Sequence, residues 1–183
     1  MLTLDSIAVL VDCWIDPADT SDSEFHKNIL KYIDNTPEIK IIILASYDTY
    51  DADLVKNDSE HNLWYKNYRS LTDYSKRKQT SKVILNYVNA DKLQIAMTTF
   101  EDFKRLLNEH EEIKNIYFMG HSWHQCIHHR PIGINSCMDL GKNIIVNQKY
   151  VFNAGTLLNM ELTEPIGSYT KLKDDIYLVN RCS

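Results

Sequence analysis

Long apolar runs, a basic leader and paired cysteines are all absent from this sequence of 183 residues. No apolar run approaches the roughly 20 residues that a membrane-spanning helix needs, so we expect no membrane span. The first residues, Met-Leu-Thr-Leu-Asp-Ser, have neither the basic start nor the apolar stretch of a signal peptide. The four cysteines (Cys13, Cys126, Cys137 and Cys182) show no CxxC spacing. These absences predict a cytoplasmic protein with reduced thiols.

An excess of positive charge is also missing. The 20 Lys and Arg residues are outnumbered by 25 Asp and Glu residues, for a net charge of −5. This balance gives no reason to expect nucleic acid or an anionic membrane as the main partner. The 44% hydrophobic and 25% charged residues are ordinary for a globular protein. At this length the chain fits a single domain, residues 1–183, that can bury a proper core.

Apolar runs typical of strands buried on both faces recur along the chain. They cover residues 7–11, 39–45, 113–120 and 143–146, with shorter candidates at 93–97 and 176–179. Between them, apolar residues at helical spacing predict helices over 25–33 and 100–110, the second capped by Thr98 or Thr99. Strands that alternate with helices predict an α/β fold: a doubly wound, Rossmann-like, predominantly parallel sheet with helices on both faces.

Two stretches are expected to lie outside this sheet and its helices as an insertion and a C-terminal extension. Residues 51–90 are polar and aromatic, and residues 56–92 carry a local net charge of +4. Aromatic residues between basic ones can indicate binding of single-stranded nucleic acid, but no nucleic-acid motif accompanies them. We therefore expect a lid-like insertion that packs its tyrosines on the domain. Residues 153–183 are expected to extend the same domain at its C-terminus.

The stretch around Cys126 predicts a functional turn. Residues 116–120 form an apolar strand, and a polar turn leads to Cys126 and a helical segment that Gly141 stops. Pro131 requires this helix either to kink or to begin its regular part there. In open α/β sheets, ligands bind at such strand-to-helix turns on the carboxyl edge. Because a helix N-terminus stabilises a thiolate, Cys126 is a candidate nucleophile.

Asp12 holds the equivalent position after the strand at 7–11. Right-handed crossovers place Asp12 and Cys126 at the same sheet edge, and the side chains would meet if their strands are neighbours. A carboxylate near a thiol can take its proton, but alone it opposes thiolate formation by like-charge repulsion. The chemistry therefore needs a cation, such as a lysine. The alternative is that Asp12 only caps the following turn.

The order of residues 7–12, 120–126 and 141–146 resembles that of the isochorismatase-like, or cysteine hydrolase, superfamily, which includes nicotinamidases and N-carbamoylsarcosine amidases. The first segment is similar to the family's first strand with its catalytic Asp. The second has its spacing from a strand-ending glycine to the cysteine. The run Arg130-Pro131-Ile132-Gly133 is similar to a subgroup with Arg-Pro-x-Gly after the cysteine. The resemblance covers roughly residues 5–152.

The resemblance implies a hydrolase that cleaves a small amide, ureido or related C–N compound through a thioester-type intermediate. It implies Asp12 as general base, Cys126 as nucleophile, and a lysine upstream of the helix at 100–110, for which Lys92 is near the right place. Backbone amides of residues 123–126 would form the oxyanion hole. We expect no cofactor, and the family's habit of forming dimers or tetramers makes a homo-oligomer an expectation too.

Side chains around these positions are candidates for contact with a small-molecule substrate. They are Trp14, Tyr47, His121, Ser122, Trp123, His124 and Arg130. The aromatic ones would form apolar pocket walls, although aromatic residues are more often core. Arg130 would bind a substrate carboxylate, or else pair with a structural acid. His128 and His129 are expected at the surface or against the substrate.

No metal site is expected. The family's nicotinamidases carry one built from an Asp and histidines after the second strand; Asp48 matches that Asp, but Tyr50 replaces a histidine. His124 and His128 lie four residues apart and, with Cys126, would be a conceivable zinc site. No partner carboxylate or CxxC spacing supports that reading.

A second interpretation is a catalytically degenerate member that keeps the fold to bind a small molecule or a protein. The poor match around Lys92 and the missing metal histidines favour it. In both interpretations the expected partners exclude nucleic acid and membrane.

Overall fold

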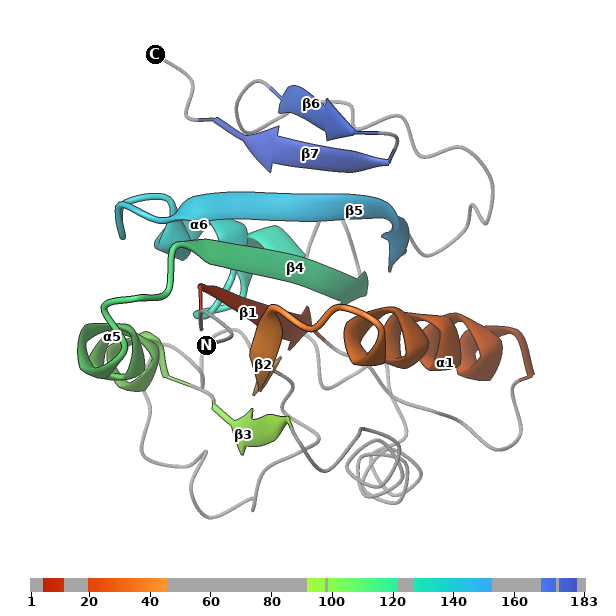
Figure 1. The fold of residues 1–183 in the computed structure, drawn as a ribbon, viewed down its shortest axis with the longest axis horizontal. Coiled ribbons are helices and arrows are strands. Elements are labelled where there is room, and N and C mark those ends of the chain that lie inside the picture. The colour runs from red at the N-terminus through yellow and green to blue at the C-terminus, as the bar shows by residue number, and fades with distance from the viewer. Residues whose placement is uncertain are drawn as a thin grey trace.

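The structure is a computed structural model that describes residues 5–11, 20–45, 92–97, 99–121, 127–152, 169–173 and 175–180. Within these residues, seven strands form one sheet in the order β3-β2-β1-β4-β5-β7-β6 (Figure 1). The strands are β1 (Ser6–Val11), β2 (Ile39–Ala45), β3 (Leu93–Ala96), β4 (Asn115–His121), β5 (Asn143–Phe152), β6 (Tyr169–Lys173) and β7 (Ile176–Val179). The helices are α1 (Thr20–Asp34), α5 (Phe100–Glu109) and α6 (Ile134–Cys137).

Five neighbouring strands, from β3 to β5, pair in parallel, and β7 and β6 add an antiparallel hairpin at one edge. The chain moves outward from β1 through β2 to β3, then crosses back to place β4 and β5 on the other side of β1. The strand order therefore reverses between β1 and β4, the topological switch point of a doubly wound sheet. This confirms the predicted α/β fold with a predominantly parallel sheet.

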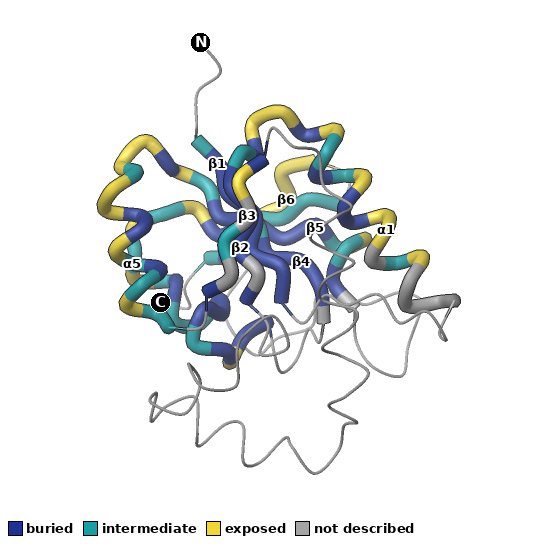
Figure 2. Tube along the Cα trace, turned by 90° about the horizontal axis from the view of Figure 1, so that it is seen from below, coloured by how far each residue is buried: buried dark blue, intermediate teal, exposed yellow. Residues whose placement is uncertain are grey.

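Helices cover both faces of the sheet (Figure 2). On one face, Ile29, Leu30 and Ile33 of α1 pack with Ala8, Leu10 and Met119. On the other, α5 and α6 pack against Val9, Val11 and Phe118. β1 is buried along its whole length, which explains why its sequence is an unbroken apolar run.

A ladder of polar side chains closes the amino-terminal edge of three central strands. Asn143 Nδ2 donates to Asn115 Oδ1 at 2.9 Å, and Asn115 Nδ2 donates to Ser6 Oγ at 3.2 Å. Ser6 Oγ in turn donates to Asp5 Oδ1 at 2.8 Å. The ladder fixes the register of β5, β4 and β1 at the level of their first residues, because a slip in any strand would break it.

The structure differs from the sequence prediction at three elements. The helical segment expected between Cys126 and Gly141 is broken: a short turn covers residues 127–129, and α6 begins only at Ile134 with Gly133 as its N-cap. β5 is longer than the expected strand at 143–146. β6 was not predicted, because its residues are mostly exposed and lack an apolar run.

Candidate active site

The switch point brings the ends of β1 and β4 side by side. The two strands pair in register from Ser6↔Asn115 to Val11↔Gly120. Gly120 has φ 113, a conformation that L side chains rarely adopt, which explains the glycine at this strand end. Asp12 is the next residue after Val11, and residues 122–126 follow β4. Asp12 and Cys126 themselves lie outside the described residues, so their side-chain geometry stays a prediction.

The chain after Cys126 returns directly to the core. Ile127 is fully buried in the same apolar cluster as Val11. His128 is 1% exposed, so of the two places expected for it, the surface or the substrate, the surface is wrong, whereas His129 is exposed. Arg130 is also buried, at 6% exposure. A buried guanidinium keeps its proton, so Arg130 brings a permanent positive charge to within four residues of Cys126.

Gly133 explains the glycine of the Arg-Pro-x-Gly run. A Cβ atom at this position would lie 2.7 Å from the carbonyl oxygen of Arg130 and 2.8 Å from that of His128. Both atoms belong to the backbone and cannot move aside without shifting the turn. Any larger residue would therefore disturb the segment that follows Cys126.

The structure corrects the placement of Lys92. Its Nζ donates to the carbonyl oxygens of Thr36, at 2.9 Å, and Ile39, at 2.6 Å, and the residue is 7% exposed. Lys92 precedes β3, and Leu93 pairs with Ile41 near the start of β2. It therefore lies at the amino edge of the sheet, about five residue steps, or roughly 16 Å, from the level of Val11.

The carboxyl end of β3 carries an uncharged residue instead. Met97 follows the strand there and is buried in the cluster that contains Val11, Ala45 and Ile127. β1, β2 and β3 end in Val11, Ala45 and Ala96, none of which is a cation. Among the described residues that end these three strands, none is a lysine that could serve a thiol at the carboxyl edge.

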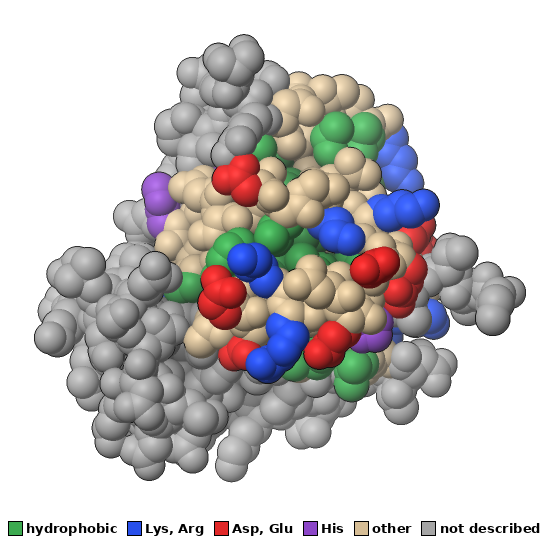
Figure 3. Space-filling view, turned by 90° about the vertical axis from the view of Figure 1, so that its left-hand side faces the viewer, with side chains coloured by type: hydrophobic (Ala, Val, Ile, Leu, Met, Phe, Trp, Pro, Cys, Tyr) green, Lys and Arg blue, Asp and Glu red, His purple; other side chains and the backbone are tan. Residues whose placement is uncertain are grey.

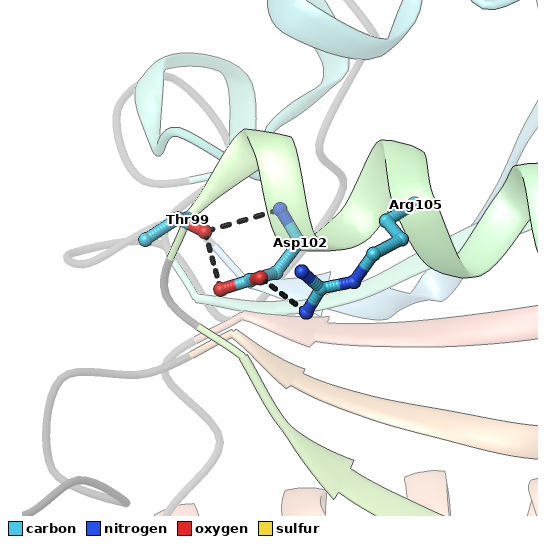
Figure 4. Close-up of polar contacts among 3 residues, drawn as sticks. All are labelled: Thr99, Asp102 and Arg105. Carbon is cyan, nitrogen blue, oxygen red and sulfur yellow. Dashed lines mark hydrogen bonds and ion pairs between the residues drawn. The ribbon is translucent and has the colours of Figure 1, made fainter.

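A local network starts α5 two residues after Met97 (Figure 4). Thr99 is the N-cap: its Oγ1 accepts a hydrogen bond from the Asp102 backbone amide at 3.1 Å and donates to Asp102 Oδ2 at 2.7 Å. The other carboxylate oxygen of Asp102 accepts from Arg105 at 2.7 Å. Of the two predicted caps, Thr98 and Thr99, the structure therefore shows Thr99. Asp102 also balances the charge of Arg105.

Cys137 is a buried thiol that was not predicted to react. It is fully buried in α6 and free of any disulfide. Burial raises the pKa of its thiol far above the usual range, so this sulfur stays protonated and inert. Cys137 is therefore an internal reference for thiol reactivity.

The other predicted contacts are mostly outside the described part of the chain. Trp14, Tyr47, Ser122, Trp123 and His124 lie in segments that the structure does not describe. His121 is the last residue of β4. Among the described residues, no group of three His, Cys, Asp or Glu could hold a metal ion, and no helix is long and apolar enough to cross a membrane.

The charge pattern on one described face of the molecule indicates which charged partners that face could attract. On the side of the molecule where α5 lies, basic and acidic side chains intermingle (Figure 3). Exposed pairs contribute to this pattern, such as Lys104 with Glu101 at 3.8 Å. Alternating signs do not produce the one-signed field that attracts a phosphate backbone.

No protein-family model and no curated protein matches the chain. Among solved structures, the nicotinamidase SaPncA from Staphylococcus aureus is similar over 82% of this chain and 84% of that one, with 15% identity and a TM-score of 0.45. A nicotinamidase PncA from Bacillus subtilis is similar over 81% and 87%, with 13% identity and a TM-score of 0.48. At this similarity, the assignment of the fold rests on the strand order itself.

Proposed function

We propose that this chain is a cysteine hydrolase that cleaves the C–N bond of a small amide, ureido or related compound. The observation that carries the proposal is the in-register pairing of β1 and β4, which ends at Val11↔Gly120. Asp12 leaves the sheet from one of these strand ends and the turn to Cys126 from the other. An acid and a thiol on neighbouring strands at a switch point form a minimal base and nucleophile.

In the proposed reaction, Asp12 takes the proton of the Cys126 thiol as the sulfur attacks the carbonyl carbon. A C–S bond forms, and backbone amides of residues 123–126 hold the negative oxygen. The C–N bond then breaks, and the leaving nitrogen takes the proton from Asp12. Water then attacks the thioester carbon and gives one proton to Asp12. The C–S bond breaks, the sulfur takes the proton back from Asp12, and the acid product leaves.

Positive charge must come from elsewhere than Lys92. Asp12 alone would raise the pKa of a neighbouring thiol, because two negative charges repel each other. In this proposal the buried Arg130 supplies positive potential on the Cys126 side. Trp14, Tyr47, His121, Ser122, Trp123 and His124 remain the proposed substrate contacts. We propose neither a metal nor a cofactor.

Thiol reactivity tests the nucleophile without knowledge of the substrate. The protein is treated with limiting iodoacetamide between pH 6 and pH 8, and the alkylated cysteines are identified by mass spectrometry. We expect Cys126 to react at least about a hundredfold faster than Cys137, since a thiolate reacts and a buried thiol does not. Equal reactivity of the two thiols would refute the proposal.

Turnover is measured as release of ammonia or amine from a panel of small amides and ureido compounds. Cys126→Ala is expected to lower the rate by about a thousandfold or more and Asp12→Asn by about a hundredfold. Cys182→Ala is the matched control and should retain full activity. A rate that survives Cys126→Ala would exclude the thioester route.

The placement of Lys92 and Met97 favours a second candidate, a binding protein that has lost turnover. Without a cation at the end of β3, a thiol at the switch point would be a poor nucleophile at neutral pH. This candidate predicts slow alkylation of Cys126 together with ligand binding that Cys126→Ala leaves intact. The alkylation experiment therefore separates the two functions.

A further inference from the structure

A hollow of 510 Å³ lies between α1 and β5, on the face of the sheet that α1 covers. Phe25 and Tyr32 line it from α1, and Tyr150 lines it from β5. These rings are half-buried and pack their inner sides on the core cluster beneath α1. A volume of this size is typical of a site for a small molecule.

Tyr32 and Tyr150 pack against each other on one side of the hollow, and this pair is called the ring platform. The centroids of Tyr32 and Tyr150 are 4.7 Å apart, with an interplanar angle of 35°. Partial burial and the neighbouring Tyr32 ring raise the pKa of Tyr150, so its hydroxyl stays a neutral donor at physiological pH. Planar ligands stack on the open faces of such rings.

Two ammonium groups flank this platform. Lys31 projects from α1 and Lys149 precedes Tyr150 on β5. Lys149 Nζ lies 2.7 Å from Asp175 Oδ2, but its side chain is 68% exposed, so water screens this pair and a ligand anion can share the cation. The amides of Asn28 and Asn35 complete the polar lining.

An irregularity in β5 creates this lining. Phe118 and Gly120 of β4 pair with Val146 and Val151, so β5 takes five residue steps where β4 takes two. The extra residues form a bulge in which the Lys149 amide donates to Asn147 Oδ1 at 3.1 Å. Bulges redirect side chains and are common next to functional sites.

From these observations we propose that the groove between α1 and β5 binds a small planar aromatic anion, with its ring against the open side of the Tyr32–Tyr150 pair and its carboxylate or phosphate held by Lys31 and Lys149. The ring geometry selects planarity and the two lysines select negative charge. The proposal does not draw on the thiol chemistry proposed above, because none of the lining residues is among the proposed catalytic or substrate-contact residues.

Protein-detected NMR titration with 2-naphthoate tests the site. We expect a Kd below about 1 mM, with shifts concentrated on α1 and β5. Cyclohexanecarboxylate lacks the planar ring and 2-naphthalenemethanol lacks the charge, so each should bind about tenfold more weakly. If the neutral alcohol binds as tightly as the anion, or the shifts map elsewhere, the proposal is wrong.

Three lysine variants locate the charge. Lys31→Gln and Lys149→Gln should each weaken 2-naphthoate binding by roughly threefold to tenfold. Lys27→Gln is the matched control, because Lys27 is exposed one turn away on α1 and does not line the groove; it should bind like the unmodified protein. An equal loss in Lys27→Gln would mean general attraction to a basic helix and would overturn the proposal.

Two further variants separate this site from folding and from the proposed hydrolase. Tyr32→Leu should weaken binding about tenfold while thermal unfolding stays cooperative. Cys126→Ala should leave the Kd unchanged, so that loss of turnover with retained binding shows two independent sites. Retained affinity in a folded Tyr32→Leu variant would refute the ring platform.

Discussion

The two ends of β3 carry opposite chemistry. Lys92, at the amino end, is a buried cation that donates to two backbone carbonyls. Met97, at the carboxyl end, is a buried thioether in the apolar core. A thiol site at the carboxyl edge would need the reverse order. A lysine at nearly the right position along the chain can thus lie roughly 16 Å, the five residue steps from Lys92 to Met97, from where the chemistry needs a cation.

Replacing Lys92 should have the largest effect on stability. In Lys92→Met the carbonyls of Thr36 and Ile39 lose charge-assisted hydrogen bonds, so we expect the free energy of unfolding to fall by about 3 kcal/mol in urea denaturation. Lys27→Met, at an exposed position, should change it by less than about 0.5 kcal/mol. The alkylation rate of Cys126 in the folded Lys92→Met variant should stay unchanged. A stable variant with an unreactive Cys126 would restore a catalytic role for Lys92.

Gly133→Ala tests how closely the turn at residues 127–133, which follows Cys126, is packed. The added Cβ would meet two backbone oxygens below 3.0 Å, so we expect a loss of about 2 kcal/mol in the free energy of unfolding. Gly141→Ala is the comparison: φ is +67 there but space is open, so the cost should be about 1 kcal/mol. If Gly133→Ala is the milder change, the turn after Cys126 is looser than the structure indicates.

Met97→Lys places a cation at the carboxyl end of β3. If a cation at the carboxyl end of β3 reaches the proposed thiol, the pKa of Cys126 should fall by about one unit, and alkylation near pH 7 should speed up by about tenfold. Met97→Gln has similar length without charge and should not do this. Equal effects in both variants would assign the change to packing. No effect in either would mean that this strand end does not face Cys126.

Thr99→Ala should have the smallest effect. It removes the N-cap bond to the Asp102 amide and should lower the free energy of unfolding by about 1 kcal/mol, measured in urea. Thr99→Ser keeps the hydroxyl and should retain most of the stability. If Thr99→Ala lowers the free energy of unfolding as much as Lys92→Met, the N-cap of α5 stabilises more of the fold than the first turn of that helix.

The fold could be predicted because its strands are buried on both faces. β2 lies at the residues that its isoleucine run predicted, and α5 begins after Thr99 and ends before His110 as its apolar stripe and cap required. β6 was not predicted because it has no apolar pattern of its own. Its pairing with β7 holds it in the sheet. α6 lies within the helical segment that was expected after Cys126, but the start at Ile134 was not predicted, because the close approach under Gly133 is not revealed by local propensity.

The candidate site was less predictable for the same kind of reason. The sequence indicated strand ends, and the β1–β4 pairing agrees with the placement of Asp12 and the Cys126 turn on neighbouring strands. It also contained a signal against Lys92: in a parallel sheet, a residue before a strand lies at the amino edge. The burial of His128 and Arg130 depends on how residues 127–133 fold back onto the core, which spacing alone does not give.

The polar ladder at the amino edge also affects the order in which the chain can fold during synthesis. The hydrogen bond from Asn115 to Ser6 joins residues that lie 109 positions apart. At a synthesis rate of about 5–20 residues per second, β1 must wait roughly 5 to 20 s before its central partner β4 leaves the ribosome. During that interval β2 is available to cover one edge of β1, and the apolar edge that later receives β4 is open to the chaperones of the cell.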